Sequence, residues 1–372
     1  MGLPVFVFGS LLHAPVRDTV LGAAAVSRPA QMPGAQARAR DCLEEPVAVA
    51  DENGAVPGML LDGLAPDQRA RLDYYLRVQG LAPRVGRVAT AGGLLEAEYY
   101  TGAADAGGQS RIFDAWPTWC RAVAEQAAVE IMRAFGQEPV ASVRARLPMI
   151  RARAASRVRG AAADAPASLR ADWGRGMVRE RSHRQPWAGF FTVEESILSY
   201  RRFDGSMSAE VSRAGFVGGD AALVLPYDPA HDLVLVIEQF RYGPWLRLDP
   251  RPWLLEPIAG RVDAEETPEA CARREAREEA GLEIGGLEHV ADYYPSPGVD
   301  SEFFYTFVGL ADLASHREGI GGLASEHEDI RSHVIPFARL MELVSSGEVN
   351  CGPLVLLALW LGQNRPRLRG QA

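Results

Sequence analysis

The stretch that decides the fold of the C-terminal half is residues 260–282, which read GRVDAEETPEACARREAREEAGL. Three local signals predict a helix within it. Thr267 is a good N-cap, Pro268 suits the first helical position, and Gly281 is a natural C-terminal stop. We therefore expect a helix over residues 268–280.

One face of this helix carries three carboxylates. Glu275, Glu278 and Glu279 stand at i, i+3 and i+4, a spacing that brings side chains together on one side of a helix. Like charges at this spacing destabilise a helix without a counter-charge. A divalent cation would supply that charge, and Mg²⁺ suits carboxylate oxygens that face substrate phosphates. The alternative is an exposed helix whose acids are neutralised by Arg273, Arg274 and Arg277.

The spacing around the helix favours the metal site, because it resembles the Nudix box. The matching positions are Gly260, Glu266, Arg274, Glu275, Glu278, Glu279, Gly281 and Leu282. Ala276 departs from the pattern, since the family usually has a larger aliphatic residue there. The resemblance implies an α/β fold, an α/β/α sandwich with a mixed sheet.

The same resemblance implies roles for individual residues. Glu275 and Glu279 would be the main metal ligands, and the carbonyl of Ala259 would complete the metal's shell. Glu278 would assist them as a catalytic residue. A separate pair, Glu266 with Arg274, would fix the loop that leads into the helix.

Segments outside the box resemble Nudix hydrolases of the ADP-ribose pyrophosphatase type. Pro297, in the run Tyr294-Pro295-Ser296-Pro297-Gly298, lies fifteen residues after Leu282, where that subfamily has a proline. The other segments that resemble the subfamily are Glu238–Arg241, Pro252–Glu256 and Ser325–Ile330. The resemblance extends over residues 185–361.

Further roles are implied position by position. Arg241 is expected to contact the diphosphate of the substrate, and Glu302 is expected to contact the ligand. Glu326 corresponds to the loop carboxylate that acts as catalytic base, and Glu328 corresponds to an additional metal ligand. Because enzymes of this type pair as dimers, we expect a homodimer in which the substrate-binding residues Phe190 and Arg213 serve the neighbouring subunit.

The implied reaction is attack of water on the pyrophosphate bond of a nucleoside diphosphate sugar, with Mg²⁺ or Mn²⁺ as cofactor. ADP-ribose is the favoured substrate, and its products are AMP and ribose 5-phosphate. One alternative is a nucleotide-sugar pyrophosphatase of the GDP-mannose type. Two others are a regulator that binds ADP-ribose without hydrolysing it, and a γ-glutamyl-amine cyclotransferase acting through the N-terminal domain.

The N-terminal segment resembles γ-glutamylcyclotransferase-like proteins, which implies a small α+β β-barrel domain. The run Val5–Leu11 matches a strand and an anion-binding Gly-Ser loop, with Phe8 in place of the family's tyrosine. Gly63-Leu64, followed by Leu72–Tyr75, also matches. The family's proton-shuttling glutamate follows such a run, but here Leu76 stands in that position. We therefore predict no cyclotransferase activity.

Two other acids are candidates to replace that glutamate. Glu44 and Glu45 lie beside Pro46 in an expected loop, where we interpret both as solvated surface acids. A γ-glutamylcyclotransferase-like module joined to a Nudix domain resembles the two-domain proteins associated with tellurite resistance.

A chain of 372 residues is long enough for two domains. We expect a γ-glutamylcyclotransferase-like domain over residues 1–150, closed by a helix from Thr118, and a Nudix domain over residues 186–366. Between them, residues 151–185 hold nine arginines and three acidic residues, which suggests a connector. The strands expected in the Nudix domain are residues 221–225, 233–240, 253–258 and 303–308, and a terminal helix is expected near Pro336.

The composition argues against nucleic acid and membranes as partners. The net charge of -9 argues against general nucleic-acid binding. The longest apolar stretch, Pro353–Leu361, is much shorter than the roughly 20 residues that span a bilayer, so we expect a cytoplasmic protein without a membrane partner. The four cysteines are Cys42, Cys120, Cys271 and Cys351. They are far apart and include no CxxC pair, so we expect neither a zinc site nor a dense disulfide framework. We interpret all four as buried or incidental thiols.

Overall fold

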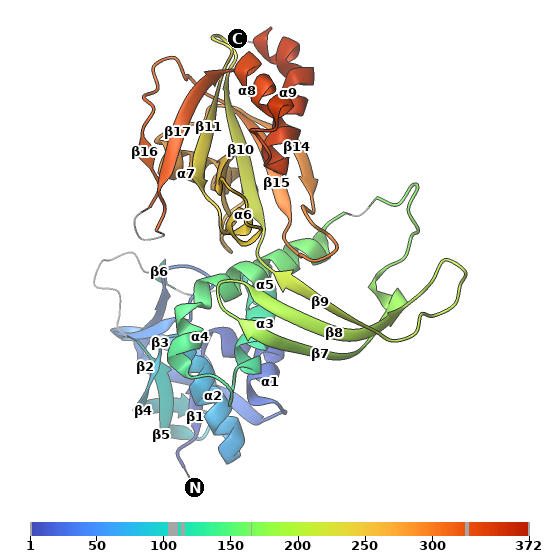
Figure 1. The fold of residues 1–372 in the computed structure, drawn as a ribbon. Helices are drawn as coiled ribbons and strands as arrows, with labels where there is room; N and C mark the ends of the chain where they lie inside the picture. The colour runs from blue at the N-terminus through green and yellow to red at the C-terminus, as the bar shows by residue number, and fades with distance from the viewer. Residues whose placement is uncertain (1, 103–110, 113–115, 165, 324–326, 371–372) are drawn as a thin grey trace. The chain divides into compact units, whose positions relative to one another are not determined.

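The computed structural model describes residues 2–102, 111–112, 116–164, 166–323 and 327–370 (Figure 1). The chain forms two compact units, Met1–Ala171 and Asp172–Ala372. Each unit is described below by itself.

The N-terminal unit is built on a closed five-stranded barrel. Its strands pair in the order β3-β1-β5-β4-β2, and β2 closes the ring by pairing with β3. The strands are β1 (Val5–Val7), β2 (Val26–Ala39), β3 (Val47–Asp62), β4 (Ala82–Thr90) and β5 (Gly93–Thr101), and β6 (Arg111–Ile112) extends the sheet beyond β2. Phe6, Leu60, Val88 and Ala97 fill the barrel interior. The predicted α+β barrel is confirmed.

Helices cover this barrel. They are the 3-10 helix η1 (Gly9–Leu12) and the α-helices α1 (Ala14–Leu21), α2 (Pro66–Val78), α3 (Thr118–Arg133), α4 (Val140–Ala145) and α5 (Leu147–Ala162). The helix predicted from Thr118 is confirmed as α3. Its Val123, Ala127 and Ile131 are buried, as the four-residue spacing of its apolar positions requires.

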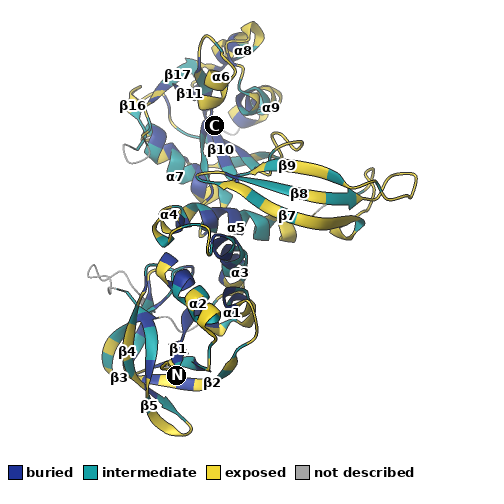
Figure 2. Ribbon diagram, turned by 60° about the horizontal axis from the view of Figure 1, so that its bottom comes forward, coloured by how far each residue is buried: buried dark blue, intermediate teal, exposed yellow. Residues whose placement is uncertain are grey.

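The structure differs from the expected connector over residues 151–185. Residues 151–162 lie in α5, which packs along α3, and both helices are largely buried there (Figure 2). Arg153 is fully buried, and its Nε lies 3.2 Å from Oε1 of Glu130, while Arg157 also reaches Glu130. The N-terminal unit therefore does not end at the α3 helix. Composition could not show this, because the counter-charge of Arg153 lies 23 residues earlier in the chain.

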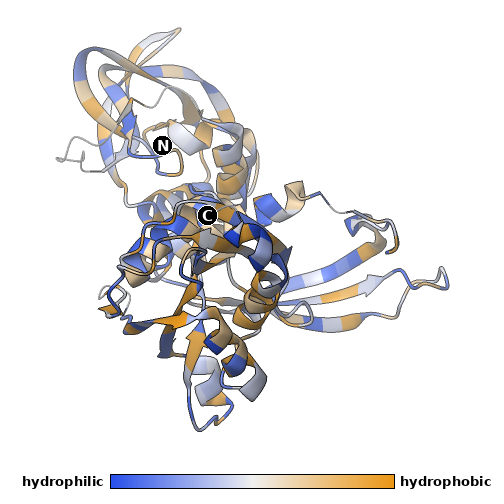
Figure 3. Cartoon of the chain, turned by 90° about the horizontal axis from the view of Figure 1, so that it is seen from above, coloured by the Kyte–Doolittle hydropathy of each residue, from blue (hydrophilic) through white to orange (hydrophobic). Residues whose placement is uncertain are grey.

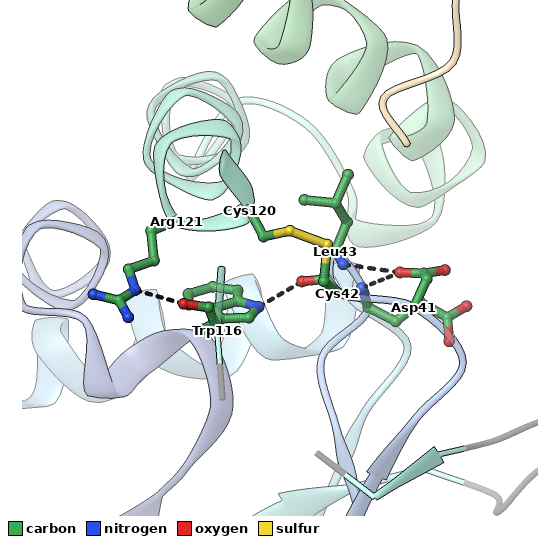
Figure 4. The surroundings of a disulfide bond; sticks show 7 residues. Asp41, Cys42, Leu43, Trp116, Cys120 and Arg121 are labelled. Atoms are coloured by element: carbon green, nitrogen blue, oxygen red, sulfur yellow. Dashed lines mark hydrogen bonds between the residues drawn. A yellow bond between two sulfur atoms is a disulfide. The ribbon is translucent and has the colours of Figure 1, made fainter. Parts of the chain in front are cut away.

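The cysteine interpretation is wrong for two of the four residues. Cys42, in the loop between β2 and β3, forms a disulfide with Cys120 in the first turn of α3 (Figure 4). Asp41 accepts hydrogen bonds from the amides of Leu43 and Glu44, and the indole of Trp116 donates to the carbonyl of Cys42. The two cysteines are 78 residues apart, so only the tertiary fold brings their Cα atoms to 5.9 Å.

A mixed eight-stranded sheet forms the centre of the C-terminal unit. The main order is β14-β15-β10-β11-β17-β16, with β10 parallel to β15. The strands are β10 (Ala221–Asp228), β11 (Leu233–Phe240), β12 (Trp253–Glu256), β13 (Ile258–Arg261), β14 (Leu287–Tyr293), β15 (Phe304–Leu310), β16 (Ile320–Gly321) and β17 (Ile330–Pro336). The strand expected over 253–258 is two strands, because Pro257 lacks an amide donor and β12 pairs with β11 while β13 pairs with β10.

Helices cover both faces of this sheet, which confirms the predicted α/β/α sandwich. Ala222 and Val224 of β10 pack toward α7 (Pro268–Ala280), whereas Leu225 and Tyr227 pack toward α8 (Phe337–Ser346) and α9 (Gly352–Arg369). This alternation follows the period of two of a strand buried on both faces. A short helix, α6 (Tyr242–Leu246), follows β11.

A second sheet precedes this sandwich, and the sequence analysis did not predict it. It holds β7 (Val178–Ala188), β8 (Thr192–Tyr200) and β9 (Val211–Val217), after the 3-10 helix η2 (Arg175–Met177). Most of its residues are exposed or half-buried (Figure 2), and both hydrophobic and hydrophilic residues lie along its strands (Figure 3). A weak apolar pattern with no buried face is a poor signal for a strand.

Among the described residues, no helix is both long and apolar enough to cross a membrane.

Candidate active site

The site begins where β13 passes under the carboxylates of α7. The amide of Ala259 donates to Oε2 of Glu279 over 3.3 Å. A Cβ atom at Gly260 would lie only 1.7 Å from Oε1 of Glu275, so β13 needs glycine here for this close approach. Thr267 caps α7 by accepting from the amide of Ala270, and Gly281 ends the helix in the left-handed conformation. These end signals set the helix so that its acids face β13.

The carboxylates on this face are short of positive charge. Burial raises the pKa of Glu275 to about 7, where Arg274 opposes the shift and the charges of Glu278 and Glu328 add to it. Burial also holds the pKa of Glu279 well above its usual range, and the charges of Glu275 and Glu328 raise it further. A divalent cation among these acids would stabilise their ionised forms, so the donor set fits one.

Arg274 ties the loop to the helix. Its guanidinium donates to Oε1 of Glu266 and to Oε1 of Glu275, each over 2.6 Å, to Oε2 of Glu278 over 2.9 Å, and to the carbonyl of Arg261 over 3.1 Å. Burial alone would lower the pKa of Arg274, but these acids raise it above its usual range. The predicted contact between Glu266 and Arg274 is confirmed, and Arg274 also partly neutralises two acids of the metal-site face.

The loop before β17 brings a fourth carboxylate. Glu328 is half-buried, its Oε2 accepts from the amide of Leu323 over 3.0 Å, and its charge raises the pKa of Glu275 and of Glu279. It therefore lies with the α7 acids. Glu326, the expected catalytic base, lies outside the described residues.

Arg241 is held by Glu256 and acts on the charge of two further acids. Its Nε donates to Oε2 of Glu256 over 2.7 Å, and its charge lowers the pKa of Glu279 and of Glu302. Burial nevertheless raises the pKa of Glu302 to about 7, with Asp300 adding to the shift. The charge of Arg241 thus acts both on Glu279 of α7 and on Glu302. Glu256 was in a segment that resembled the subfamily, but the sequence did not show that this buried acid would hold Arg241.

The two expected partner-facing residues behave differently. Arg213 is exposed on β9, where its guanidinium donates to the carbonyl of Ser212 over 2.9 Å. The ring of Phe190 packs on Arg261 of its own chain, 4.5 Å from the guanidinium carbon. Sequence analysis did not predict the contact of Arg261 with Phe190, because the two residues are far apart in the sequence.

The N-terminal unit has a small pocket of its own. The amide of Ser10 donates to Oε2 of Glu45 over 3.0 Å, and the hydroxyl of Tyr75 donates to Oε1 over 3.5 Å. Burial raises the pKa of Glu45, so the interpretation of this residue as a solvated surface acid is wrong. Glu44 instead pairs with Arg40. The cavity that Glu45 and Leu76 line has a volume of about 10 Å³, which is room for about one water molecule.

Clustered acids on an α/β/α sandwich, with an arginine opposite them, define the class of site that fits a divalent cation and an anionic ligand. The sequence profile described as "NUDIX domain" matches residues 218–348. An ADP-ribose pyrophosphatase of Escherichia coli (strain K12) is 37% identical over 206 residues, which cover 55% of this chain and 98% of that protein. The chain therefore belongs to the Nudix family, and it is a hydrolase.

Two further comparisons concern the same part of the chain. A GDP-mannose pyrophosphatase of Escherichia coli O139:H28 (strain E24377A / ETEC) is 32% identical over 172 residues, which cover 46% of this chain and 88% of that protein. A solved structure described as "Crystal structure of ADP compounds hydrolase" is 21% identical, covers 50% of this chain and 96% of its own, and has a TM-score of 0.39. Nudix hydrolases generally use divalent metal ions such as Mg²⁺.

Proposed function

We propose that this protein hydrolyses the pyrophosphate bond of ADP-ribose in a Mg²⁺-dependent reaction that yields AMP and ribose 5-phosphate. The observation that carries the proposal is the group of crowded carboxylates, Glu275, Glu279 and Glu328, with the Arg241 guanidinium beside them. The relative with the name ADP-ribose pyrophosphatase, at 37% identity, supports this substrate.

Four groups would hold Mg²⁺ or Mn²⁺: the carboxylates of Glu275, Glu279 and Glu328 and the carbonyl of Ala259. When bound, the metal supplies positive charge to the phosphate oxygens and lowers the pKa of the attacking water. Glu278 lies next to Glu279 in α7 and about one turn after Glu275, and it is half-buried, so it assists these ligands at the solvent side. Two of these ligands, Glu275 and Glu279, are on the helix α7, which keeps their geometry fixed during the reaction.

Arg241 and Glu302 would orient the substrate, and Glu326 would take part in proton transfer. Arg241 would bind the diphosphate, because Glu256 fixes its guanidinium while much of the side chain stays accessible. Glu302 would accept a hydrogen bond from a substrate hydroxyl or amine close to the diphosphate. Glu326 would act as the base that accepts the proton of the attacking water.

We also propose a homodimer in which Arg213 serves the site of the neighbouring subunit. Supporting this, the sheet of β7, β8 and β9 exposes large apolar side chains, which monomers usually keep few and scattered: Val178, Trp187, Ile197, Tyr200 and Phe216. Light scattering at micromolar concentration tests the proposal. A fully active monomer would remove it.

A nucleotide-sugar pyrophosphatase of the GDP-mannose type is the second candidate, because a relative with that name is 32% identical. The higher identity to an ADP-ribose pyrophosphatase favours ADP-ribose. A regulator without activity is disfavoured, since a pure binder would not need three metal-binding acids.

A panel of ADP-ribose, GDP-mannose and other nucleotide sugars, incubated with Mg²⁺ and resolved by chromatography, tests these assignments. We expect AMP from ADP-ribose at the highest rate, and no products in excess chelator. Full activity in chelator, or no turnover of any nucleoside diphosphate sugar, would overturn the proposed function.

For the N-terminal unit, we propose a γ-glutamylcyclotransferase-like fold that has no cyclotransferase activity. The closed barrel and the Gly9–Ser10 loop support the fold. Leu76 and the very small cavity support the loss of activity.

A further inference from the structure

A cavity of about 890 Å³ lies in the C-terminal unit, between the central sheet and α8. Its wall is formed by residues of β11, β12 and β17, by the segment before β12, and by α8 with the turn that follows it. Small-molecule sites have volumes of about 300–1,000 Å³. The cavity therefore has room for a ligand of the size of a nucleotide.

Strand alternation places this cavity on the opposite face of the sheet from α7. Ile330 of β17 packs in the core cluster of α7, whereas Ile335 packs in the cluster of α8. Arg331 and His333 share the face of Ile335, because side chains two residues apart point to the same side of a strand. Both line the cavity. The cavity is thus separate from the candidate active site, whose main acids lie on α7.

One arginine of the wall is held in place by a carboxylate. Glu238 of β11 stands directly opposite Arg331 of β17 in the antiparallel register. Nε of Arg331 donates to Oε2 of Glu238 over 3.1 Å, and Nε2 of His333 lies 3.0 Å from the same oxygen. Arg331, helped by His333, holds the pKa of Glu238 below its usual range, so this carboxylate is ionised. The Arg331 side chain is still 61% exposed, which leaves N–H donors for a second anion.

A second arginine of the wall has no carboxylate of its own. Within the described parts of the chain, no acidic side chain pairs with the exposed guanidinium of Arg251, which precedes β12. Asp249 accepts a hydrogen bond from the backbone amide of Arg251 over 3.0 Å, but it pairs with the side chain of Arg247. Both Arg251 and Arg331 therefore keep donors for an added anion. Phosphate suits a guanidinium group because it can accept two parallel hydrogen bonds.

An indole provides an aromatic surface on the same wall. Trp253 of β12 lines the cavity and is 56% exposed, and Phe240 supports its ring edge to face, with centroids 5.5 Å apart. Strands β12 and β17 flank β11, so two strand spacings, about 10 Å, separate the strand of Trp253 from that of Arg331. A nucleoside monophosphate is long enough to contact both side chains.

We propose that this cavity is a second ligand site, which binds a nucleoside monophosphate with its base on Trp253 and its phosphate on Arg331 and Arg251. Stacking on an indole stabilises a planar base, and the two guanidinium groups supply charge-assisted hydrogen bonds to the phosphate. Glu348 and Asn350 also line the cavity, and they offer acceptors for the ribose hydroxyls. The site takes no part in the proposed reaction and does not depend on it.

Equilibrium dialysis of the full chain in chelator against labelled AMP, adenosine and inorganic phosphate tests the site. Trp253→Leu removes the indole, and Arg331→Met removes the guanidinium but keeps the length of the side chain. We expect each variant to weaken AMP binding at this site about 10-fold. Trp253→Leu should also weaken adenosine binding and leave phosphate binding unchanged, whereas Arg331→Met should do the reverse. In the double variant the two losses should multiply, because the two side chains contact different parts of AMP.

Two matched controls carry the same side chains outside the cavity. Trp245 of α6 is 57% exposed and does not line the cavity. Arg184 of β7 pairs with Glu195 on the neighbouring strand, in the way that Arg331 pairs with Glu238. Trp245→Leu and Arg184→Met should leave AMP binding unchanged. Losses in these controls as large as those in the cavity variants would overturn the proposal.

A photoreactive azido derivative of AMP locates the site directly, which matters because AMP is also a product of the proposed reaction. After irradiation with the full chain, mass spectrometry should find the label within residues 249–255, and Trp253→Leu should reduce it there. An absence of label from this segment would overturn the proposal. So would an AMP affinity that neither Trp253→Leu nor Arg331→Met changes. If the unaltered protein hydrolysed no ADP-ribose, the proposed function would fail, while these binding results would still decide the role of the cavity.

Discussion

Oε1 of Glu275 lies directly over the backbone of Gly260, only 1.7 Å from where a Cβ atom would be. The Glu275 carboxylate of α7 and the backbone of β13 therefore meet without any intervening side chain. This contact makes the geometry of the acids sensitive to a single methyl group.

Gly260→Ala should displace the Glu275 carboxylate. We expect a loss of kcat/KM of at least about 100-fold, because a shift near 1 Å at a catalytic group has that effect. Overpacking should also lower the free energy of unfolding by about 1–3 kcal/mol. Steady-state kinetics and thermal unfolding measure both. Gly352→Ala is the control, since a Cβ atom at Gly352 would meet open space; similar losses in both variants would contradict the explanation.

Glu279→Gln removes one buried charge from the crowded acids but keeps the shape of the side chain. We expect a fall in kcat of at least about 100-fold, the scale of losing one preorganised charge-stabilising group. The unfolding temperature should stay constant or rise, because like-charge repulsion with Glu275 and Glu328 is relieved. Near-normal turnover would show that the metal lies elsewhere.

Glu275 should make the stability of the metal-free protein depend on pH. Its pKa is about 7 in the folded protein against about 4.5 when unfolded, so the unfolded state ionises first. Protonated Glu275 therefore contributes fully to the free energy of unfolding below about pH 4.5, and this contribution is lost as the pH rises through about 7. Thermal unfolding in chelator should show this fall. Glu302, with a similarly raised pKa, adds to it, so Glu275→Gln should reduce the slope without abolishing it. An unchanged slope in Glu275→Gln would count against the assignment.

Added Mg²⁺ should reverse that trend. The metal needs ionised carboxylates, so its stabilising effect should increase with pH up to and somewhat above 7. A Mg²⁺-induced rise in the unfolding temperature that is equal at pH 5 and pH 8 would contradict a site built on Glu275.

The disulfide between Cys42 and Cys120 should stabilise the N-terminal unit. Closing a loop of this length contributes about 4 kcal/mol in the chain-entropy model. Reduction by a dithiol should therefore lower the unfolding temperature of that unit. The paired substitution Cys42→Ser with Cys120→Ser should be equally destabilised and insensitive to the reductant. A reductant effect that persists in this variant would have to come from elsewhere.

The full chain should release no 5-oxoproline from γ-glutamyl amines. Leu76 cannot shuttle a proton, and the carboxyl of Glu45 is already held by the Ser10 amide in a cavity that holds about one water molecule. Release of 5-oxoproline that disappears in Glu45→Gln would prove this prediction wrong and would make Glu45 the replacement acid.

Local sequence determined those parts of the protein whose signals lie within a few residues of each other. The boundaries of α7 follow from Thr267, Pro268 and Gly281, and most of β11 follows from the unbroken apolar run over residues 233–237. The contact of Glu266 with Arg274 belongs to the same class, since both residues lie in one loop and helix. Backbone propensity and short-range spacing are enough for these features.

Only the tertiary structure decided which distant groups meet. The disulfide joins residues 78 positions apart, Arg153 is buried against Glu130, and Glu45 fills a pocket beside Ser10. Arg261 meets Phe190 because a turn of one sheet lies over a strand of another. Charge counts and periodicity describe one residue with its near neighbours, whereas burial and charge pairing depend on the whole fold. The Nudix box can therefore be recognised from the sequence, whereas the groups that surround it can be identified only from the tertiary structure.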